Sequence, residues 1–311
     1  MRTAFIETLF ELAQADERIM LVVGDLGFGV VTPFMERLPK QFVNAGVAEQ
    51  NMTGLAVGMA LSGKIVFTYS IANFPTLRCL EQIRNDVCYH NANVKIVSVG
   101  GGMCYGALGI SHHATEDIAI MRALPNMVVV APGDPIETAL ATRAIAAHHG
   151  PCYLRLGRAG EPVVHNSSNI EFQLGKAITV REGSDLTLIA TGGLLRNAVE
   201  AGQRLAERGI RARVLSMHTV KPIDVEAVLK AARETAAIFT VEEHTVVGGL
   251  GSAVAEILME ATERPLAFRR IGLRDIFSAK VGDQDYLRFQ YGLDVAGIVR
   301  TVETVLSKVV G

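Results

Sequence analysis

An acidic residue lies at the start of a helix made mostly of small side chains. Residues 42–51 read FVNAGVAEQN, so a short apolar stretch leads into a Gly- and Ala-rich helix that begins near Glu49. Burial among small neighbours disfavours the charged form of a carboxylate, which would make Glu49 a proton carrier in catalysis. The alternative interpretation is a first-turn acid that complements the helix dipole.

A glycine-rich loop with two histidines follows a predicted buried strand. Residues 100–113 contain repeated glycines, which let the backbone approach a ligand closely, and they end in His112 and His113. Either imidazole could act as an acid, a base or an oxyanion partner. A flexible surface loop with two solvated histidines is the alternative. Because adjacent histidines point apart and no cysteine or third histidine lies at ligand spacing, no metal site is expected here.

Two arginines mark a third strand end. Arg155 and Arg158 flank the end of a short apolar stretch, where guanidinium groups can hold a phosphate or a carboxylate through two hydrogen bonds. Solvated surface arginines are an equally good interpretation of this pattern. Two other glycine motifs, in residues 24–26 and 248–251, lack the spacing of diphosphate–magnesium and dinucleotide sites, so no such site is assigned to them.

The elements that must position these residues alternate between strands and helices. Four short β-branched runs, each bounded by turn residues, predict strands of a parallel sheet that is covered on both faces. They are residues 19–23, 65–69, 94–99 and 127–131. Asp134 and Pro135 predict the start of a helix, whose inward face we expect to contain Ile136, Leu140 and Ala144. Ligands of such sheets bind beyond the carboxyl ends of the strands.

A second alternating unit follows a polar stretch. Its predicted strands are residues 186–190, 212–217 and 237–242. The pattern therefore predicts an α/β protein with two consecutive domains, each a mainly parallel sheet flanked by helices. The predicted boundaries are 1–165 for the first domain, 166–184 for a linker with one short strand, and 185–311 for the second domain.

Charge and composition limit the possible partners. The 311 residues carry 30 Lys and Arg against 32 Asp and Glu, a net charge of −2. This balance argues against nucleic acid and against a membrane surface as partners. No apolar run approaches the roughly 20 residues of a membrane-spanning helix. Four scattered cysteines without a CxxC pair favour a reduced, cytoplasmic protein.

Four motifs taken together resemble transketolases. They are residues 44–52 (NAGVAEQNM), 78–85 (RCLEQIRN), 111–117 (SHHATED) and 241–244 (VEEH). Their order and spacing resemble the C-terminal half of a transketolase over nearly the whole chain. The resemblance implies a pyrimidine-binding domain followed by a transketolase C-terminal domain.

The resemblance also implies a function and its partners. The chain would be the second subunit of a split transketolase, transferring a two-carbon ketol unit between sugar phosphates or to a related aldehyde acceptor. We expect an N-terminal transketolase subunit to hold most of the thiamine diphosphate and Mg2+. A homodimer contact and an α2β2 heterotetramer are expected, with the cofactor at the interface between subunits.

Cofactor contacts follow from the same resemblance. Glu49 would hydrogen-bond a ring nitrogen of the cofactor's aminopyrimidine and assist proton transfer, and Phe74 would stack on that ring. Ile71 and Leu77 lie where transketolases usually carry aromatics, so the pocket would be apolar but less aromatic. Asp25 matches an acid near the cofactor.

The resemblance implies substrate contacts as well. His112 matches the histidine at the reacting end of the substrate, and His113 lies beside it. Arg158 and Arg2 match arginines that hold the sugar phosphate.

Two positions depart from the pattern of the family. Leu108 replaces an acid that senses a substrate hydroxyl, and Gly100 replaces a further substrate histidine. A modified or branched sugar phosphate, or a smaller aldehyde acceptor, would suit the loosened site.

Two other functions remain open at this point. Beta subunits of 2-oxoacid-decarboxylating thiamine enzymes and deoxyxylulose-phosphate synthase have the same two domains, and carbon dioxide release would distinguish their reactions. A catalytically silent paralogue is the third possibility. The departures at Leu108 and Gly100 favour it, whereas retention of Glu49 and His112 argues against it.

Overall fold

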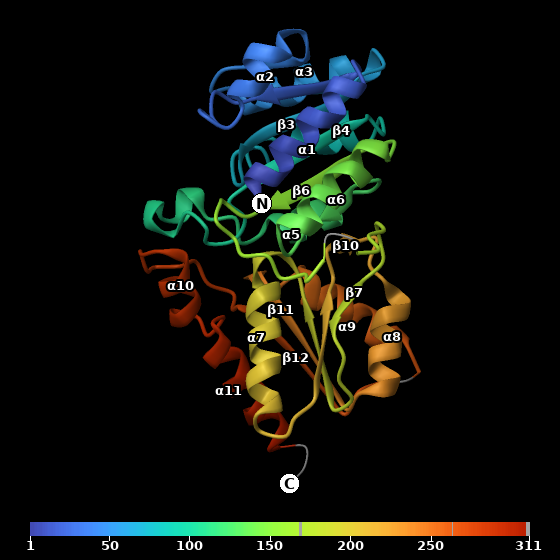
Figure 1. Ribbon diagram of the computed structural model, residues 1–311, viewed down its shortest axis with the longest axis vertical. Helices are drawn as coiled ribbons and strands as arrows, with labels where there is room; N and C mark the ends of the chain where they lie inside the picture. The colour runs from blue at the N-terminus through green and yellow to red at the C-terminus, as the bar shows by residue number, and fades with distance from the viewer. Residues whose placement is uncertain (168–169, 263, 309–311) are drawn as a thin grey trace.

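Two sheets, each between layers of helices, lie one above the other along the long axis of the molecule (Figure 1). The computed structural model describes residues 1–167, 170–262 and 264–308. In spatial order, the described strands of the first sheet are β10 (Thr219–Lys221), β5 (Val128–Val130), β6 (Cys152–Leu156), β4 (Val94–Val99), β3 (Ile65–Ile71), β1 (Ile19–Val23) and β2 (Phe42–Asn44). Those of the second sheet are β12 (Ala267–Leu273), β11 (Ala237–Thr245), β8 (Leu186–Ala190), β9 (Ala212–Ser216) and β7 (Ile178–Arg181). The predicted fold class is confirmed.

Helices cover both faces of the first sheet. One face carries α1 (Arg2–Ala15) and α6 (Pro135–Ala147). The other carries α3 (Glu49–Leu61), α4 (Leu80–Gln82) with its π-helical continuation Ile83–Cys88, and α5 (Asp117–Ala123). A short helix, α2 (Thr32–Arg37), follows β1. Successive side chains of β1 enter the two cores alternately, as a strand buried on both faces requires.

The second sheet has the same three layers. Helices α7 (Leu195–Ala206) and α11 (Val295–Leu306) pack on one face, and α8 (Val225–Glu234) and α9 (Leu250–Glu260) pack on the other. A further helix, α10 (Gln284–Gln290), lies against the loop that follows β4 (Figure 1). This helix therefore brings the second domain to the region where the first domain carries its histidines.

The buried face of α6 differs from the predicted one. Asp134 caps the helix by accepting a hydrogen bond from the Glu137 amide, as the sequence predicts. The expectation that Ile136, Leu140 and Ala144 point inward is wrong, because these residues are only partly buried. The buried side chains of α6 are Glu137, Thr138, Ala141, Thr142 and Ile145. Their polar groups have internal partners, so polarity does not prevent their burial.

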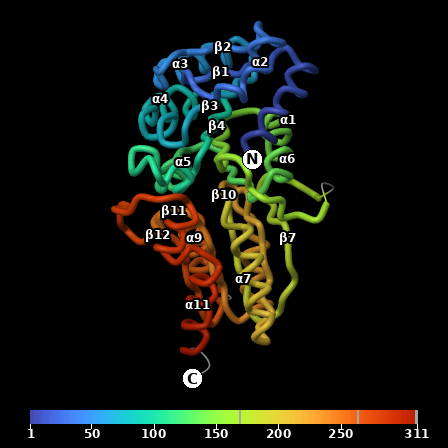
Figure 2. Tube along the Cα trace, turned by 60° about the vertical axis from the view of Figure 1, so that its left-hand side comes forward, coloured from blue at the N-terminus to red at the C-terminus, as the bar shows by residue number. Residues whose placement is uncertain are grey.

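A short strand from the second half of the chain joins the first sheet. β10, from the second half, pairs antiparallel with β5 at the edge of the first sheet. The predicted linker 166–184 contains β7, which pairs antiparallel with β9, and Figure 2 shows this stretch running beside the second domain. Residues 168–169 of the linker and residues 309–311 of the predicted second domain lie outside the described residues. Within the described chain, no helix is both long and apolar enough to cross a membrane.

Candidate functional site

The residues singled out from the sequence gather at one edge of the first sheet. β1, β2, β3, β4 and β6 are parallel, so the segments that follow them leave the sheet on the same side. This edge carries Glu49, Phe74 and His112. The topology, rather than proximity in the sequence, brings these side chains together.

Glu49 is a buried carboxylate with one oxygen left free. It is the first residue of α3, and only 2% of its surface is exposed. Its Oε2 accepts a hydrogen bond of 2.7 Å from Nη1 of Arg78, whose side chain is 49% exposed. Among the described residues no donor reaches Oε1. A Cβ atom at Gly24 would lie 3.8 Å from this oxygen, so the glycine keeps the space in front of it open.

Arg78 and Phe74 complete the surroundings of Glu49. The guanidinium carbon of Arg78 lies 4.7 Å from the centre of the Phe74 ring. One planar cation therefore contacts both the carboxylate and the aromatic face. From the sequence, Arg78 is only one member of a motif and has no role of its own. Arg78 lies in the loop between β3 and α4, where nothing in the sequence predicts its contact with Glu49.

The two neighbouring histidines have different environments. His112 is partly buried, its ring centre is 5.2 Å from that of Phe74, and its Nδ1 is 3.0 Å from Oγ of Ser111. His113 is buried, and neither of its ring nitrogens has a hydrogen-bond partner among the described residues. Burial lowers the pKa of His113, which keeps its imidazole neutral. Of these two histidines, only His112 belongs to the sheet-edge cluster, which consists of Glu49, Phe74 and His112.

Tyr105 joins this cluster to a large cavity. Its ring centre is 6.2 Å from that of His112, and the guanidinium carbon of Arg158 lies 5.6 Å from the Tyr105 ring centre. A cavity of about 1010 Å³ opens between the domains and is lined by Tyr105, Leu108, Arg158 and Glu243 among others. Glu49, Phe74 and His112 do not line it. The cavity therefore adjoins the cluster, and Tyr105 borders both.

The remaining predicted cofactor contacts lie at the ends of β1 and β3 or in the segments that follow them. Asp25 is exposed just after β1, where its amide and carboxylate form hydrogen bonds with the Asn44 side chain of 3.1 and 2.9 Å. Ile71 is partly buried at the end of β3, and Leu77 is 44% exposed.

Arg2 lies at the start of α1, and its charge acts on Tyr105. Burial raises the pKa of Tyr105, and the positive charges of Arg2 and Arg158 oppose that shift. Both predicted phosphate-binding arginines therefore lie close enough to this phenol to influence it electrostatically. Arg158 is exposed and Arg2 is partly buried.

Arg155, the second arginine of the same strand end, has a structural role. It is 5% exposed, and its Nε donates a 2.7 Å hydrogen bond to Oδ2 of Asp117, which also accepts one from the Tyr153 hydroxyl. Its Nη2 donates to the carbonyl oxygens of Ala114 and Glu243 at 2.8 and 3.0 Å. Because Glu243 belongs to the second domain, Arg155 joins the two domains, and it also forms part of the wall of the cavity between them.

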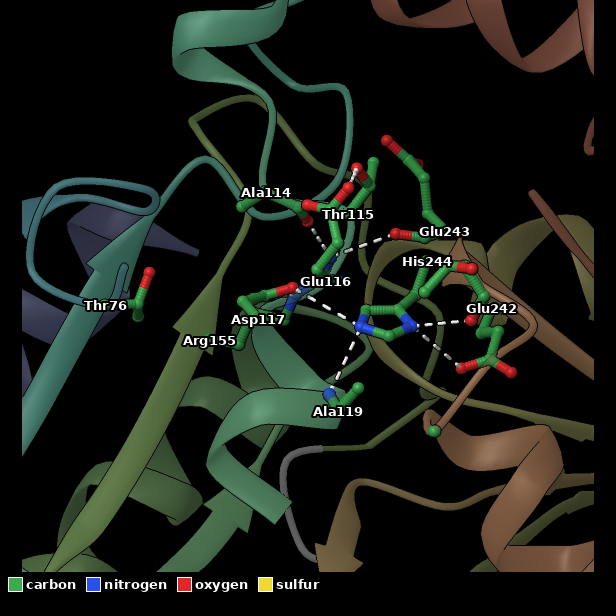
Figure 3. A network of polar contacts seen from close by, with 12 residues as sticks. Thr76, Ala114, Thr115, Glu116, Asp117, Ala119, Arg155, Glu242, Glu243 and His244 are labelled. Carbon is green, nitrogen blue, oxygen red and sulfur yellow. Dashed lines mark hydrogen bonds and ion pairs between the residues drawn. The ribbon is translucent and has the colours of Figure 1, made fainter. Parts of the chain in front are cut away.

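The VEEH motif supplies the other side of this junction. Figure 3 shows His244 between Asp117 and Ala119 on one side and Glu242 on the other. Nδ1 of His244 donates to the Thr245 carbonyl, and Nε2 accepts from the Ala119 amide, which assigns a neutral imidazole.

Glu243 links the second domain to the loop that follows β4. It is 3% exposed, and it accepts hydrogen bonds from the Met103 amide at 2.7 Å and from Arg288 Nε at 2.6 Å. A Cβ atom at Gly102 would lie 2.6 Å from its Oε1, so only glycine fits beside it.

The cluster at the sheet edge fits one face of a flat nitrogen heterocycle. The free Oε1 of Glu49 can accept a hydrogen bond from a ring N–H, and Phe74 offers an aromatic face. Gly24 leaves the approach to Oε1 open. These features suit an aminopyrimidine such as that of thiamine diphosphate.

Two protein-family models match successive stretches of the chain. The family model described as "Transketolase, pyrimidine binding domain" matches residues 1–161. The model described as "Transketolase, C-terminal domain" matches residues 175–298.

Known proteins and solved structures are similar over nearly the whole chain. An apulose-4-phosphate transketolase subunit of Phocaeicola vulgatus is 44% identical, covering 99% of this chain and 97% of that protein. The 6-deoxy-6-sulfo-D-fructose transketolase subunit of a Clostridium species is 43% identical, covering 99% and 95%. The structure of a split-gene transketolase, described as an inactive beta4 tetramer, superposes with a TM-score of 0.89 at 39% identity, covering 98% of this chain and 97% of that one.

Proposed function

We propose a function from the premise that this chain belongs to the transketolase family. We infer that it is the C-terminal subunit of a two-subunit, thiamine-diphosphate-dependent enzyme. This enzyme would transfer a two-carbon ketol unit between sugar phosphates or to a related aldehyde acceptor. Activity requires an N-terminal partner subunit.

The observation that carries the proposal is the half-built site around Glu49. A buried carboxylate with one free oxygen, an aromatic face and an open backbone approach lie together at the edge of the sheet. They can bind the aminopyrimidine end of the cofactor. The diphosphate end and Mg2+ are assigned to the partner subunit.

Glu49 and Phe74 have distinct roles in this proposal. Glu49 hydrogen-bonds the aminopyrimidine ring through its Oε1 and exchanges a proton with the ring there, and Phe74 stacks on the ring. Ile71 and Leu77 keep water away from the ring, and Asp25 lies near the cofactor. When bound, thiamine diphosphate supplies a nucleophilic carbon that accepts the two-carbon unit.

Substrate contacts come from the residues on the other side of Phe74. His112 moves a proton at the reacting end of the sugar, and Arg158 and Arg2 hold its phosphate. His113, buried behind His112, acts by positioning the loop rather than by touching substrate.

Exposed apolar side chains in the segments that follow β1, β2 and β3 support a partner subunit on this side of the first sheet. Phe28 and Val47, in the loops that follow β1 and β2, are 80% and 74% exposed, and Leu77 is 44% exposed. Exposed apolar side chains favour an interface, because a protein partner would remove them from water. A homodimer contact and an α2β2 assembly would bury this face in the complete enzyme.

Calorimetric titration of thiamine diphosphate with Mg2+ tests the proposal. The titration is made into this chain alone, and into the chain mixed with its candidate N-terminal subunit. Binding is expected only in the mixture, which should then transfer a ketol unit in a screen of ketose and aldose phosphates. The screen includes apulose 4-phosphate and 6-deoxy-6-sulfo-D-fructose, because two of the relatives are named for them.

Other outcomes would contradict the proposal in different ways. Tight binding by this chain alone would mean that the diphosphate site has been misplaced. Carbon dioxide release from pyruvate by the mixture would indicate a decarboxylating enzyme instead. Absence of binding with every N-terminal partner would indicate a chain without catalytic function.

A further inference from the structure

The ring of Tyr105 occupies the space beside Gly100. Gly100 has a φ of +91°, and a Cβ atom there would lie 2.1 Å from Cε2 and 2.4 Å from Cδ2 of Tyr105. Real Cβ atoms do not approach other atoms so closely. A side chain at position 100 and the aromatic ring at position 105 therefore exclude each other, and this chain has the aromatic ring.

Tyr105 is placed to touch a substrate. Its ring is close to both His112 and Arg158: the ring centres of Tyr105 and His112 are 6.2 Å apart, and the guanidinium carbon of Arg158 lies 5.6 Å from the Tyr105 ring centre. It also lines the cavity between the domains. Its hydroxyl forms no hydrogen bond with any of the described residues. A polar group without a partner, beside the proposed catalytic histidine, is available to a ligand.

Two other residues that line the cavity leave recognition of a ligand's polar groups to the Tyr105 hydroxyl. Leu108, three residues later, is 57% exposed and lines the same cavity with an apolar surface. Glu161 also lines the cavity, but its Oε2 is held by the amino group of Met1 at 2.6 Å. Burial raises the pKa of Tyr105, so its phenol keeps its proton at neutral pH and can donate a hydrogen bond to an oxygen of a ligand.

We propose that Tyr105 is a specificity-determining residue for the ketose donor. Its hydroxyl donates a hydrogen bond to a hydroxyl or carbonyl oxygen near the reacting end of the donor, beside His112. Leu108 contacts the adjacent carbon and favours donors without a polar substituent on that side. This inference rests on the proposed function, since it assigns a contact within the same site.

Kinetics of the reconstituted enzyme test the hydroxyl. Tyr105→Phe, assayed with the N-terminal partner and cofactor, should raise the KM of the ketose donor about tenfold, since one hydrogen bond is lost, and should change kcat much less. Donors that each lack one hydroxyl locate the contact. For the donor without the contacted oxygen, wild type and Tyr105→Phe should be equal. Tyr89→Phe, which removes a hydroxyl from an 82% exposed ring, is the matched control and should change nothing.

Thermal unfolding tests the exclusion between positions 100 and 105. Gly100→Ala should lower the melting temperature, and adding Tyr105→Ala should recover part of the loss. Gly109→Ala is the control, because Gly109 has a similar φ of +77° but no atom within 4 Å of its Cβ position. Gly109→Ala should show the smaller loss, caused by backbone strain alone, and Tyr105→Ala should not recover it.

The outcomes separate this inference from the proposed function. If the wild-type enzyme transfers ketol units and Tyr105→Phe has the same KM for every donor, the inference about Tyr105 is wrong. If the wild-type enzyme turns over no ketose phosphate, the proposed function fails instead. Titration of the ketose phosphate into wild type and Tyr105→Phe then tests Tyr105 alone: weaker binding by the variant supports the contact, and equal binding refutes it.

Discussion

Two arginine–carboxylate pairs in the first domain have nearly the same geometry and different surroundings. Glu49 and Arg78, the open pair, meet at 2.7 Å, and their side chains are 2% and 49% exposed. Asp117 and Arg155, the closed pair, also meet at 2.7 Å, but their side chains are only 1% and 5% exposed. Both carboxylates are therefore buried, and the exposure of the arginine is what differs.

The exposure of the arginine distinguishes a pair that is suited to bind a ligand from a pair that stabilises the fold. Arg155 makes further hydrogen bonds to carbonyl groups of both domains, so removing it would leave buried acceptors unpaired. Arg78 makes one hydrogen bond to Glu49, and because its side chain is half exposed, water or a ligand can take its place there. A buried carboxylate with a movable partner is suited to accept a different hydrogen-bond donor, whereas one with fixed partners is not.

The largest expected effect concerns the carboxylate of the open pair. Glu49→Ala should lower turnover by the reconstituted enzyme by about 10³-fold or more, because a positioned proton carrier is lost. The melting temperature of the chain should stay close to that of wild type, since Arg78 is free to enter solvent. Glu36→Ala, at an exposed acid, is the control. Normal turnover by Glu49→Ala would remove the distinction between the two pairs.

The arginine of the closed pair should dominate stability. Arg155→Met leaves Asp117 buried without its cation and should lower the free energy of unfolding by about 3–5 kcal/mol. Denaturant titration monitored by circular dichroism measures the loss. The control is Arg143→Met, whose ion pair with Glu11 is exposed on both sides and should contribute less than about 1 kcal/mol. A loss at Arg155 as small as that at Arg143 would contradict the closed-pair interpretation.

A buried histidine next to β10 extends the comparison to pH. His218 stacks on Phe172 with ring centres 4.0 Å apart, and its Nε2 has no partner among the described residues. Burial lowers its pKa to about 4, although the charges of Glu137 and Asp224 oppose this shift. The unfolded chain takes up a proton below about pH 6.5 and the folded chain does not, so stability is lost as the pH falls from about 6.5 to about 4.

The size of this loss should be up to about 3 kcal/mol, and unfolding measured as a function of pH will detect it. His218→Phe keeps an aromatic ring against Phe172 and should remove most of the loss. His149→Phe, at an exposed histidine, should leave the pH profile unchanged. Identical profiles for wild type and His218→Phe would show that the acid sensitivity arises elsewhere.

The smallest expected effect is that of the arginine in the open pair. Arg78→Ala should lower the free energy of unfolding by less than about 1 kcal/mol, because its side chain is half exposed and its ion pair is exchanged readily for water. The same denaturant titration measures it beside Arg155→Met. If the two arginines proved equally important for stability, exposure would not be what distinguishes the two pairs.

Much of the fold could be predicted because buried strands are strongly marked in sequence. The predicted strands 19–23, 94–99 and 186–190 match the observed bounds of β1, β4 and β8. All side chains in these strands are buried, and short runs rich in apolar and β-branched residues identify them, although β4 also buries Lys95 and Ser98 and β8 buries Thr187. The buried face of α6 could not be predicted in the same way, since it includes Glu137 and two threonines, whose partners are not visible in sequence.

Residues of the site could be predicted where a sequence motif includes them. They could not be predicted where their role depends only on the three-dimensional packing of neighbouring side chains. Glu49, Phe74 and His112 lie at one edge of the sheet. From the sequence, Gly100 is recognised only as a glycine at a position where the family has a histidine. That Tyr105 fills the vacated space depends on a left-handed turn and a ring position, which no spacing rule predicts.

The pairing of β10 with β5 has a consequence for how the chain is made. The outer edge of the first sheet is covered by residues 219–221, which are synthesised long after the rest of that domain. During translation the first domain therefore emerges with an open edge at β5, a surface that invites pairing with other chains. Its sheet is completed only when the middle of the second domain has left the ribosome, so the two domains must mature together.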